Sequence, residues 1–263
     1  MLVCSICGGE TFRDRAVIWD GLVAEWGISP DERAYIDRQQ GTCCRTCGAP
    51  LRSIALAKSI LAWARSPLVL DDFTRTLSAR RLRVLELNKA GSLNPILARL
   101  PRHVLGEYPE VDMQRLSYGN GSFDLIVHSD TLEHVPDPHT ALRECLRVLR
   151  PGGAMCFTVP IIVGRMTRSR AGLEPSYHGR PSATGDGATE TTADMAVQTE
   201  YGADAWIGLM QAGFASVEVT AAEYPSALAL IARKNTGKKP RRASLPKVGG
   251  AARRAVSRLL GRA

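Results

Sequence analysis

The chain has 263 residues, enough for one large α/β domain with a small accessory unit. Apolar residues make up 44% of it and charged residues 23%, and this balance excludes wholesale intrinsic disorder. The longest apolar run, residues 153–164, contains a proline and is too short to cross a bilayer, so no transmembrane segment is predicted. The sequence begins without a basic stretch followed by an apolar one, and we therefore expect a cytoplasmic protein without a secretory signal.

The net charge of +8 is unevenly distributed along the chain. Residues 234–263 contain ten Lys or Arg and no Asp or Glu, whereas residues 1–233 carry 24 basic and 26 acidic side chains. The main body is therefore nearly neutral. A nucleic-acid-binding surface spread over the whole molecule is excluded.

Two cysteine pairs mark residues 1–50. Cys4-x-x-Cys7 and Cys44-x-x-Cys47 each precede a glycine, and 36 residues separate the pairs. Two such turns supply four thiolates, and four thiolates satisfy the tetrahedral preference of Zn²⁺ and leave no open position. The spacing predicts a structural zinc-knuckle unit. The alternatives are Cys43 in place of Cys44, or a set of free thiols.

Residues 51–79 are predicted to form a connecting helix and linker, because Pro50 precedes a helical spacing of apolar residues that runs to about residue 65. Residues 80–233 then alternate apolar runs with helical patterns, which is typical of a mostly parallel sheet. One helix is expected to begin at Asp137-Pro138 and to end at Pro151-Gly152-Gly153, and another to close at Gly213. The expected strands are residues 82–87, 103–108, 123–130 and 154–160, followed by an antiparallel hairpin of residues 217–220 and 226–233.

One segment carries a specific resemblance. Residues 111–160 read VDMQRLSYGNGSFDLIVHSDTLEHVPDPHTALRECLRVLRPGGAMCFTVP. The F-D-L-I strand, the L-E-H-V turn, the helix ending R-V-L-R-P-G-G and the T-V-P strand end resemble the class I S-adenosylmethionine-dependent methyltransferases of the type 11-like group, and the resemblance extends over nearly all of residues 82–233. It implies a Rossmann-like, doubly wound α/β sheet with S-adenosyl-L-methionine as the cofactor.

The resemblance also implies which residues meet the cofactor. Glu86 would face its amino group, Glu107 would accept hydrogen bonds from the ribose hydroxyls, and Asp112 would accept one from the adenine amino group. The backbone amide of Met113 would meet the adenine ring, while Ser129 and Asp130 would line the pocket. The alternative for Glu107 and Asp112 is that both are solvated loop acids.

The first loop departs from the family pattern. Typical members follow the acidic residue with G-x-G-x-G, whereas this chain has Glu86-Leu87-Asn88-Lys89-Ala90-Gly91-Ser92. Asn88 tolerates the left-handed conformation, so Asn88 and Gly91 are expected to form the cofactor loop. The alternative is a non-catalytic protein that keeps the fold but has a degenerate cofactor loop.

Methyl transfer depends mainly on aligning the acceptor with the activated methyl group. A hydroxyl acceptor also benefits from a base, and His134 in the L-E-H-V turn is the candidate; a structural role in that turn is the alternative. The resemblance implies O-methylation of a small-molecule or glycan-linked acceptor. A nucleic-acid methyltransferase is the third hypothesis, although no N-P-P-Y-like tetrapeptide follows residues 123–130.

Two further segments are distinctive in composition. Residues 165–200 are rich in Gly, Ser, Thr and Pro, which predicts either a lid-like loop or disorder. Residues 234–263 form a basic tail with apolar side chains on one side of a possible helix: Ala252, Ala255, Val256, Leu259 and Leu260. We expect this tail to contact an anionic membrane surface or nucleic acid, the alternative being a solubilising terminus.

Overall fold

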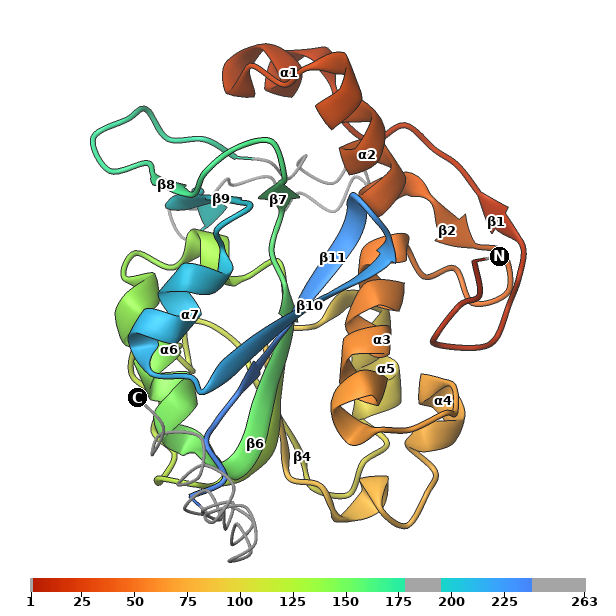
Figure 1. The fold of residues 1–263 in the computed structure, drawn as a ribbon, viewed down its shortest axis with the longest axis vertical. Helices are drawn as coiled ribbons and strands as arrows, with labels where there is room; N and C mark the ends of the chain where they lie inside the picture. The colour runs from red at the N-terminus through yellow and green to blue at the C-terminus, as the bar shows by residue number, and fades with distance from the viewer. Residues whose placement is uncertain (1, 178–194, 238–263) are drawn as a thin grey trace, which may run out of the picture.

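The computed structural model describes residues 2–177 and 195–237. A six-stranded sheet runs through the molecule in the order β10-β11-β6-β5-β3-β4 (Figure 1). Its strands are β3 (Val84–Leu87), β4 (His103–Gly106), β5 (Phe123–Ser129), β6 (Leu149–Thr158), β10 (Ser216–Glu223) and β11 (Ser226–Arg233). Strands β4, β3, β5 and β6 are parallel, and β11 is antiparallel to both β6 and β10. The predicted Rossmann-like sheet with a C-terminal antiparallel hairpin is confirmed.

Helices cover both faces of this sheet, which explains why its central strands are apolar on both sides. On one face lies α3 (Leu51–Ala64), which is buried along most of its length and packs on β11, β10 and β6. On the other face lie α6 (Pro138–Val148) and α7 (Trp206–Ala212) (Figure 1). The shorter helices are α4 (Leu70–Phe73), α5 (Asn94–Leu97), η1 (Ala79–Arg81), η2 (Gly91–Leu93) and η3 (Leu132–His134).

The junction between α6 and β6 differs from the prediction. Helix α6 begins where expected, since the Asp137 carboxylate accepts the Thr140 N–H at 3.0 Å. It ends at Val148, however, and β6 begins at Leu149, ahead of the Pro-Gly-Gly turn predicted to separate the two. Leu149 pairs with Phe123, and the register then shifts between Phe123 and Leu125. Residues 151–153, the Pro-Gly-Gly segment, therefore belong to an irregular part of β6. Proline is tolerated within a sheet at such irregularities.

The N-terminal residues pack against α3 and share its core. They form β1 (Phe12–Arg13), α1 (Asp20–Trp26), α2 (Pro30–Gly41) and β2 (Cys43–Cys44), with β1 and β2 antiparallel. One buried apolar cluster runs from Cys4 and Ile6 through α3 to Ile231 in β11. The helix of the predicted connecting region therefore does more than connect, because it covers one face of the sheet.

A second, three-stranded sheet lies above the carboxyl ends of the main strands, in the order β7-β9-β8 (Figure 1). Its strands are β7 (Ile161–Ile162), β8 (Arg168–Ser169) and β9 (Thr199–Gly202). The described flank of the predicted lid is fixed to α1, because Trp26 Nε1 donates to Ser176 Oγ at 2.6 Å. Residues 178–194 of the lid and residues 238–263 of the basic tail lie outside the described residues. Among the helices that are described, none combines the length and the apolar character needed to span a membrane.

Candidate functional site

A cavity of about 420 Å³ opens at the carboxyl ends of β3, β4 and β5. The chain crosses from β3 to β4 on one side and then returns to β5 on the other, so this edge is the switch point where ligands bind in open α/β sheets. Seven of the nine predicted cofactor and catalytic residues line the cavity: Asn88, Glu107, Asp112, Met113, Ser129, Asp130 and His134. Glu86 and Gly91 are not among the lining residues.

Glu86 is fully buried, and its carboxylate bonds to other groups of the protein. Its Oε1 accepts the Ala90 N–H at 2.7 Å, and its Oε2 lies 2.6 Å from His103 Nε2 and accepts Asn94 Nδ2 at 3.1 Å. Glu86 therefore holds the loop after β3 in shape. Its side chain does not line the cavity, and its expected contact with the cofactor's amino group, directly or through water, stays a prediction.

The altered first loop leaves the cavity open. Asn88 takes the left-handed conformation at φ +54°, as Gly91 does. The Asn88 N–H donates to Gly106 O at 2.8 Å, and its side-chain oxygen accepts the Tyr108 N–H at 3.0 Å, which ties the loop to the end of β4. Ala90 is completely buried and does not line the cavity. Loss of the family glycines therefore does not close this space.

The acidic side chains after β4 differ in their surroundings. The Glu107 side chain is 47% exposed, and one of its oxygens lies 3.5 Å from Lys89 Nζ. The Asp112 carboxylate accepts the Gln114 N–H at 2.8 Å and is less exposed. Met113 is buried between the cavity and the apolar core. Both carboxylates border the same cavity and can accept further hydrogen bonds.

Asp130 is the most heavily bonded acid at the cavity. It follows β5 at φ +48°, and its carboxylate accepts Thr158 Oγ1 at 2.9 Å and Gln40 Nε2 at 3.3 Å. It also forms an ion pair with Arg52. The Ser129 and Thr158 hydroxyls lie 2.9 Å apart beside it. Sequence reasoning missed Gln40 and Arg52, since both lie outside the resemblance and no motif marks them.

His134 lines the cavity from η3, with 15% of its side chain exposed. Its Nδ1 lies 3.3 Å from the Ala196 carbonyl oxygen. A carbonyl oxygen only accepts hydrogen bonds, so this contact assigns the proton to Nδ1 and leaves Nε2 as the basic nitrogen of the neutral ring. Glu133 beside it is buried, and burial raises the pKa of its carboxyl group well above the usual range. His134 is therefore the better placed of the two to take up a proton.

Residues 74–157 match the protein family described as "Methyltransferase domain". This segment includes β3, β4, β5 and most of β6, and hence most of the cavity wall. The central part of the chain is therefore similar to a methyltransferase domain.

Curated relatives resemble the same region. A ubiquinone biosynthesis O-methyltransferase of Albidiferax ferrireducens is 28% identical over 152 residues, which is 56% of this chain and 55% of the relative. A protein of the same name from Pseudomonas paraeruginosa is 30% identical over 131 residues, 48% of this chain and 49% of the relative. The chain thus spans about half the length of these relatives.

A solved structure, a possible histamine N-methyltransferase of Thermotoga maritima, shares 16% identity, covers 70% of this chain and 90% of its own, and has a TM-score of 0.39. That score is too low to support an argument, so the fold assignment rests on the strand order of this chain.

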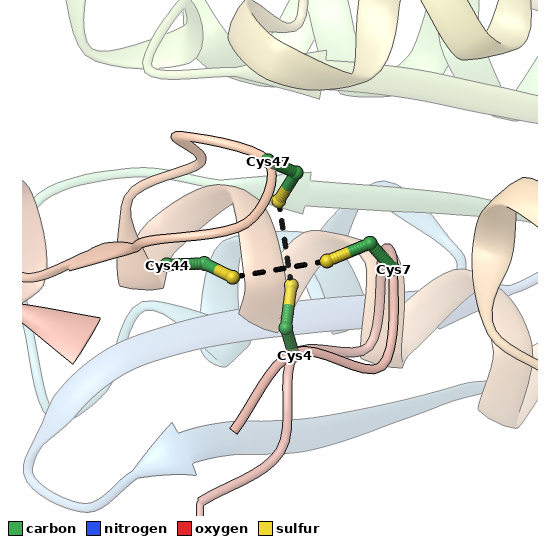
Figure 2. Close-up of side chains that lie close together, drawn as sticks. All are labelled: Cys4, Cys7, Cys44 and Cys47. Carbon is green, nitrogen blue, oxygen red and sulfur yellow. Dashed lines mark hydrogen bonds between the residues drawn. The ribbon is translucent and has the colours of Figure 1, made fainter. Parts of the chain in front are cut away.

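A cluster of four cysteines lies outside residues 74–157, the segment that matches the methyltransferase family. The sulfur atoms of Cys4, Cys7, Cys44 and Cys47 all lie within 4.8 Å of one another and point to a common centre (Figure 2). Cys4 Sγ lies 3.7 Å from Cys47 Sγ, and Cys7 Sγ lies 3.7 Å from Cys44 Sγ. Cys43 does not belong to the cluster; its thiol is 3.5 Å from the Gly41 carbonyl oxygen.

The two halves of this cluster have the same backbone geometry. The Gly8 N–H donates to Cys4 O at 2.8 Å, and the Gly48 N–H donates to Cys44 O at 2.9 Å. Gly8 and Gly48 both take left-handed conformations, at φ +80° and +77°, which residues with a Cβ rarely adopt. The arrangement presents four sulfur donors to one centre and could hold a single metal ion.

Proposed function

We propose that this chain is a cytoplasmic S-adenosylmethionine-dependent methyltransferase that methylates an oxygen atom of a small-molecule or glycan-linked acceptor. The observation that carries the proposal is the cavity at the switch point of the sheet, bordered by the carboxylates of Glu107 and Asp112. The matching domain family supports methyl transfer, and the names of the relatives favour oxygen as the accepting atom.

The residues around the cavity fit the polar parts of the cofactor. Glu107, which follows β4, would accept hydrogen bonds from the two ribose hydroxyls and Asp112 one from the adenine amino group, with the Met113 amide near the ring; all three residues line the cavity. Asn88 and Ser129 supply polar groups from the neighbouring strand ends. When bound, S-adenosylmethionine supplies a methyl group already activated on its sulfonium.

His134 is the proposed base. Its Nδ1 is oriented by the Ala196 carbonyl, so Nε2 can take the proton of an acceptor hydroxyl during transfer. Burial raises the pKa of Glu133 well above its usual range, and Glu133 does not line the cavity, so His134 is preferred over it as the base. Asp130, fixed by Arg52 and Thr158, borders the same space and helps to position the ligands.

For the cysteine cluster we propose one structural Zn²⁺. Burial opposes ionisation of the Cys44 thiol, but the backbone amides of Cys47 and Thr46 lower its pKa to about 7. Burial also raises the pKa of Cys4 well above its usual range, so a bound cation is needed to hold all four sulfurs as thiolates. Four protein ligands complete a tetrahedral site, which favours a structural role over a catalytic one.

Calorimetric titration with S-adenosylmethionine tests the central claim. We expect a dissociation constant between about 1 μM and 1 mM, the range typical of metabolic enzymes. Incubation with methyl-labelled cofactor should then place label in the small-molecule or glycan fraction of a cell extract and not in nucleic acid. If millimolar cofactor gives neither heat nor protection against unfolding, the proposal is wrong and a non-catalytic binding protein replaces it.

A further inference from the structure

The amino edge of the sheet, opposite the cavity, carries unpaired positive charge. Arg80, Arg81 and Arg83 precede β3, and Arg102 precedes β4. All four side chains belong to exposed residues, and none forms an ion pair with any other described residue. The group is compact, because the Val84 N–H donates to Arg102 O at 3.1 Å and Arg102 Nη1 lies 3.5 Å from Arg81 O.

An exposed leucine lies in the same loop. Leu77 is 77% exposed, the highest value among the large apolar residues that the structure describes. Its turn is ordered, since the Arg80 N–H donates to Thr76 O at 3.1 Å and Thr76 Oγ1 donates to Phe73 O at 2.8 Å. A single exposed leucine is common on protein surfaces. Here, however, the exposed leucine is followed three and four residues later by the exposed Arg80 and Arg81, whereas Arg75 is ion-paired with Asp71.

The basic tail leaves the domain from this edge. The Gly152 N–H, near the start of β6, donates to Asn235 O at 3.2 Å, and Lys234 Nζ donates to Leu149 O at 2.6 Å. Residues 234–263, which follow β11, contain ten Lys or Arg and no acidic residue. Because β3, β4 and β6 run parallel to one another, their starts lie at one edge of the sheet, which is the lower end of β6 in Figure 1. The arginines, Leu77 and the origin of the tail therefore share one edge.

We propose that this edge, defined by Leu77, Arg80, Arg81, Arg83 and Arg102, docks on the surface of an anionic lipid bilayer. Arginines at a bilayer pair with lipid phosphates, and an apolar side chain beside them inserts among the headgroups. Binding to a nucleic-acid backbone would use the arginines but gain nothing from Leu77.

This orientation has a consequence for access to the cavity. Parallel strands put their amino ends at one edge and their carboxyl ends at the other. The cavity, with Glu107 and Asp112, therefore faces away from the anionic surface. The acceptor enters from the aqueous side, and the acidic cavity rim is kept away from lipid phosphates. The proposal itself does not depend on the reaction proposed for the cavity.

Vesicle flotation with the full chain tests the proposal. We compare vesicles of phosphatidylcholine alone with vesicles that also contain phosphatidylserine, at low and high salt. We expect binding only to the anionic vesicles and weakening by salt. The double variant Arg80→Glu/Arg81→Glu should reduce the partition coefficient by about tenfold or more, and Leu77→Ser by about tenfold. The matched controls Arg115→Glu and Leu173→Ser, both exposed residues away from this edge, should bind as the wild type does.

Circular dichroism and urea unfolding show whether each variant keeps the native fold, so misfolding is separated from lost docking. Equal binding to both kinds of vesicle overturns the proposal. So does unchanged vesicle binding in the Leu77 and arginine variants, which would leave the tail as the sole contact. If the arginine variant instead loses binding to RNA while its vesicle binding is unaffected, the edge serves nucleic acid and the membrane proposal is wrong.

Discussion

Arg52 and Asp130 form an ion pair that links the N-terminal unit to the wall of the cavity. Arg52 lies in the first turn of α3, directly after the Cys44-x-x-Cys47 turn, whereas Asp130 ends β5. The Asp130 side chain is only 7% exposed, and Gln40 from α2 approaches the same carboxylate at 3.3 Å. The cysteine unit and the main sheet are therefore coupled through one nearly buried carboxylate.

Replacing Arg52 tests this coupling. Arg52→Met removes the cation and leaves the Asp130 carboxylate nearly buried without it, so we expect a loss of about 1–3 kcal/mol in the free energy of unfolding. Cofactor affinity should fall as well, because Asp130 borders the cavity. Urea unfolding and calorimetry measure the two effects.

Arg33→Met is the matched control for that variant. Arg33 pairs with Asp20, whose side chain is 92% exposed, and an exposed pair of this kind contributes about 1 kcal/mol or less. Equal, small losses in both variants would show that the Arg52–Asp130 pair has no special role.

The cysteine cluster gives a prediction with an internal control. Purified protein should contain close to one zinc ion per chain, and Cys44→Ser should lose the metal together with thermal stability, because metal binding and folding are linked. Cys43→Ser, one residue away but outside the cluster, should keep both. A chelator should lower the melting temperature of the wild type and leave Cys44→Ser unaffected. Zinc-free protein that is fully folded would contradict the prediction.

The two acids after β4 should contribute to cofactor affinity. A carboxylate that accepts hydrogen bonds in a partly desolvated cavity contributes about 1–3 kcal/mol, so Glu107→Ala and Asp112→Ala should each weaken binding by roughly tenfold or more. Glu110→Ala is the control, because Glu110 is exposed on the same loop and does not line the cavity. Calorimetry provides the measurement. Unchanged affinity in both cavity variants would make these residues solvated loop acids.

The sequence predicted the sheet well because apolar runs bounded by Gly and Pro mark buried strands, and the hairpin at Tyr224-Pro225 is present as expected. The junction at Leu149 was predicted wrongly. There the register shift opposite Phe123 depends on pairing between β5 and β6, which local sequence does not encode.

The candidate site was predictable only in part, for a geometric reason. Asn88, Glu107 and Asp130 each come directly after a parallel strand, so strand assignment alone brings them to one edge. Glu86 is still within β3, and its side chain is directed to Ala90 and Asn94 below the loop. Arg52 reaches Asp130 only because α3 packs on the sheet in this position, and that depends on tertiary contacts.

His128 in β5 should make stability depend on pH. Burial lowers the pKa of His128 to about 3, although the charge of Asp130 acts to raise it. The His128 ring stacks on Phe157, with the ring centres 4.7 Å apart. Neither ring nitrogen has a hydrogen-bond partner among the described residues. As the pH falls from about 7 to about 5, the unfolded chain gains a proton at this residue and the native protein does not. The free energy of unfolding should therefore fall by about 2 kcal/mol on this account.

Urea unfolding at both pH values measures this effect. In His128→Phe and in His128→Leu, the free energy of unfolding should fall by about 2 kcal/mol less between pH 7 and pH 5 than it does in the wild type. His139 is exposed, so His139→Gln should keep the pH dependence of the wild type. An unchanged pH dependence in both His128 variants would show that this imidazole takes up its proton equally in the native and the unfolded protein.

His134 provides the test of the proposed chemistry. His134→Gln keeps a polar side chain of similar size but cannot take up a proton, so cofactor binding should be nearly unchanged while turnover falls by about 10²–10⁴-fold. Turnover is followed as labelled methyl groups entering the acceptor fraction, and binding by calorimetry. His139→Gln, on the exposed start of α6, should affect neither. A structural role would produce the opposite pattern: His134→Gln would release the Ala196 carbonyl, weaken binding and stability together, and leave the turnover of the bound complex close to that of the wild type.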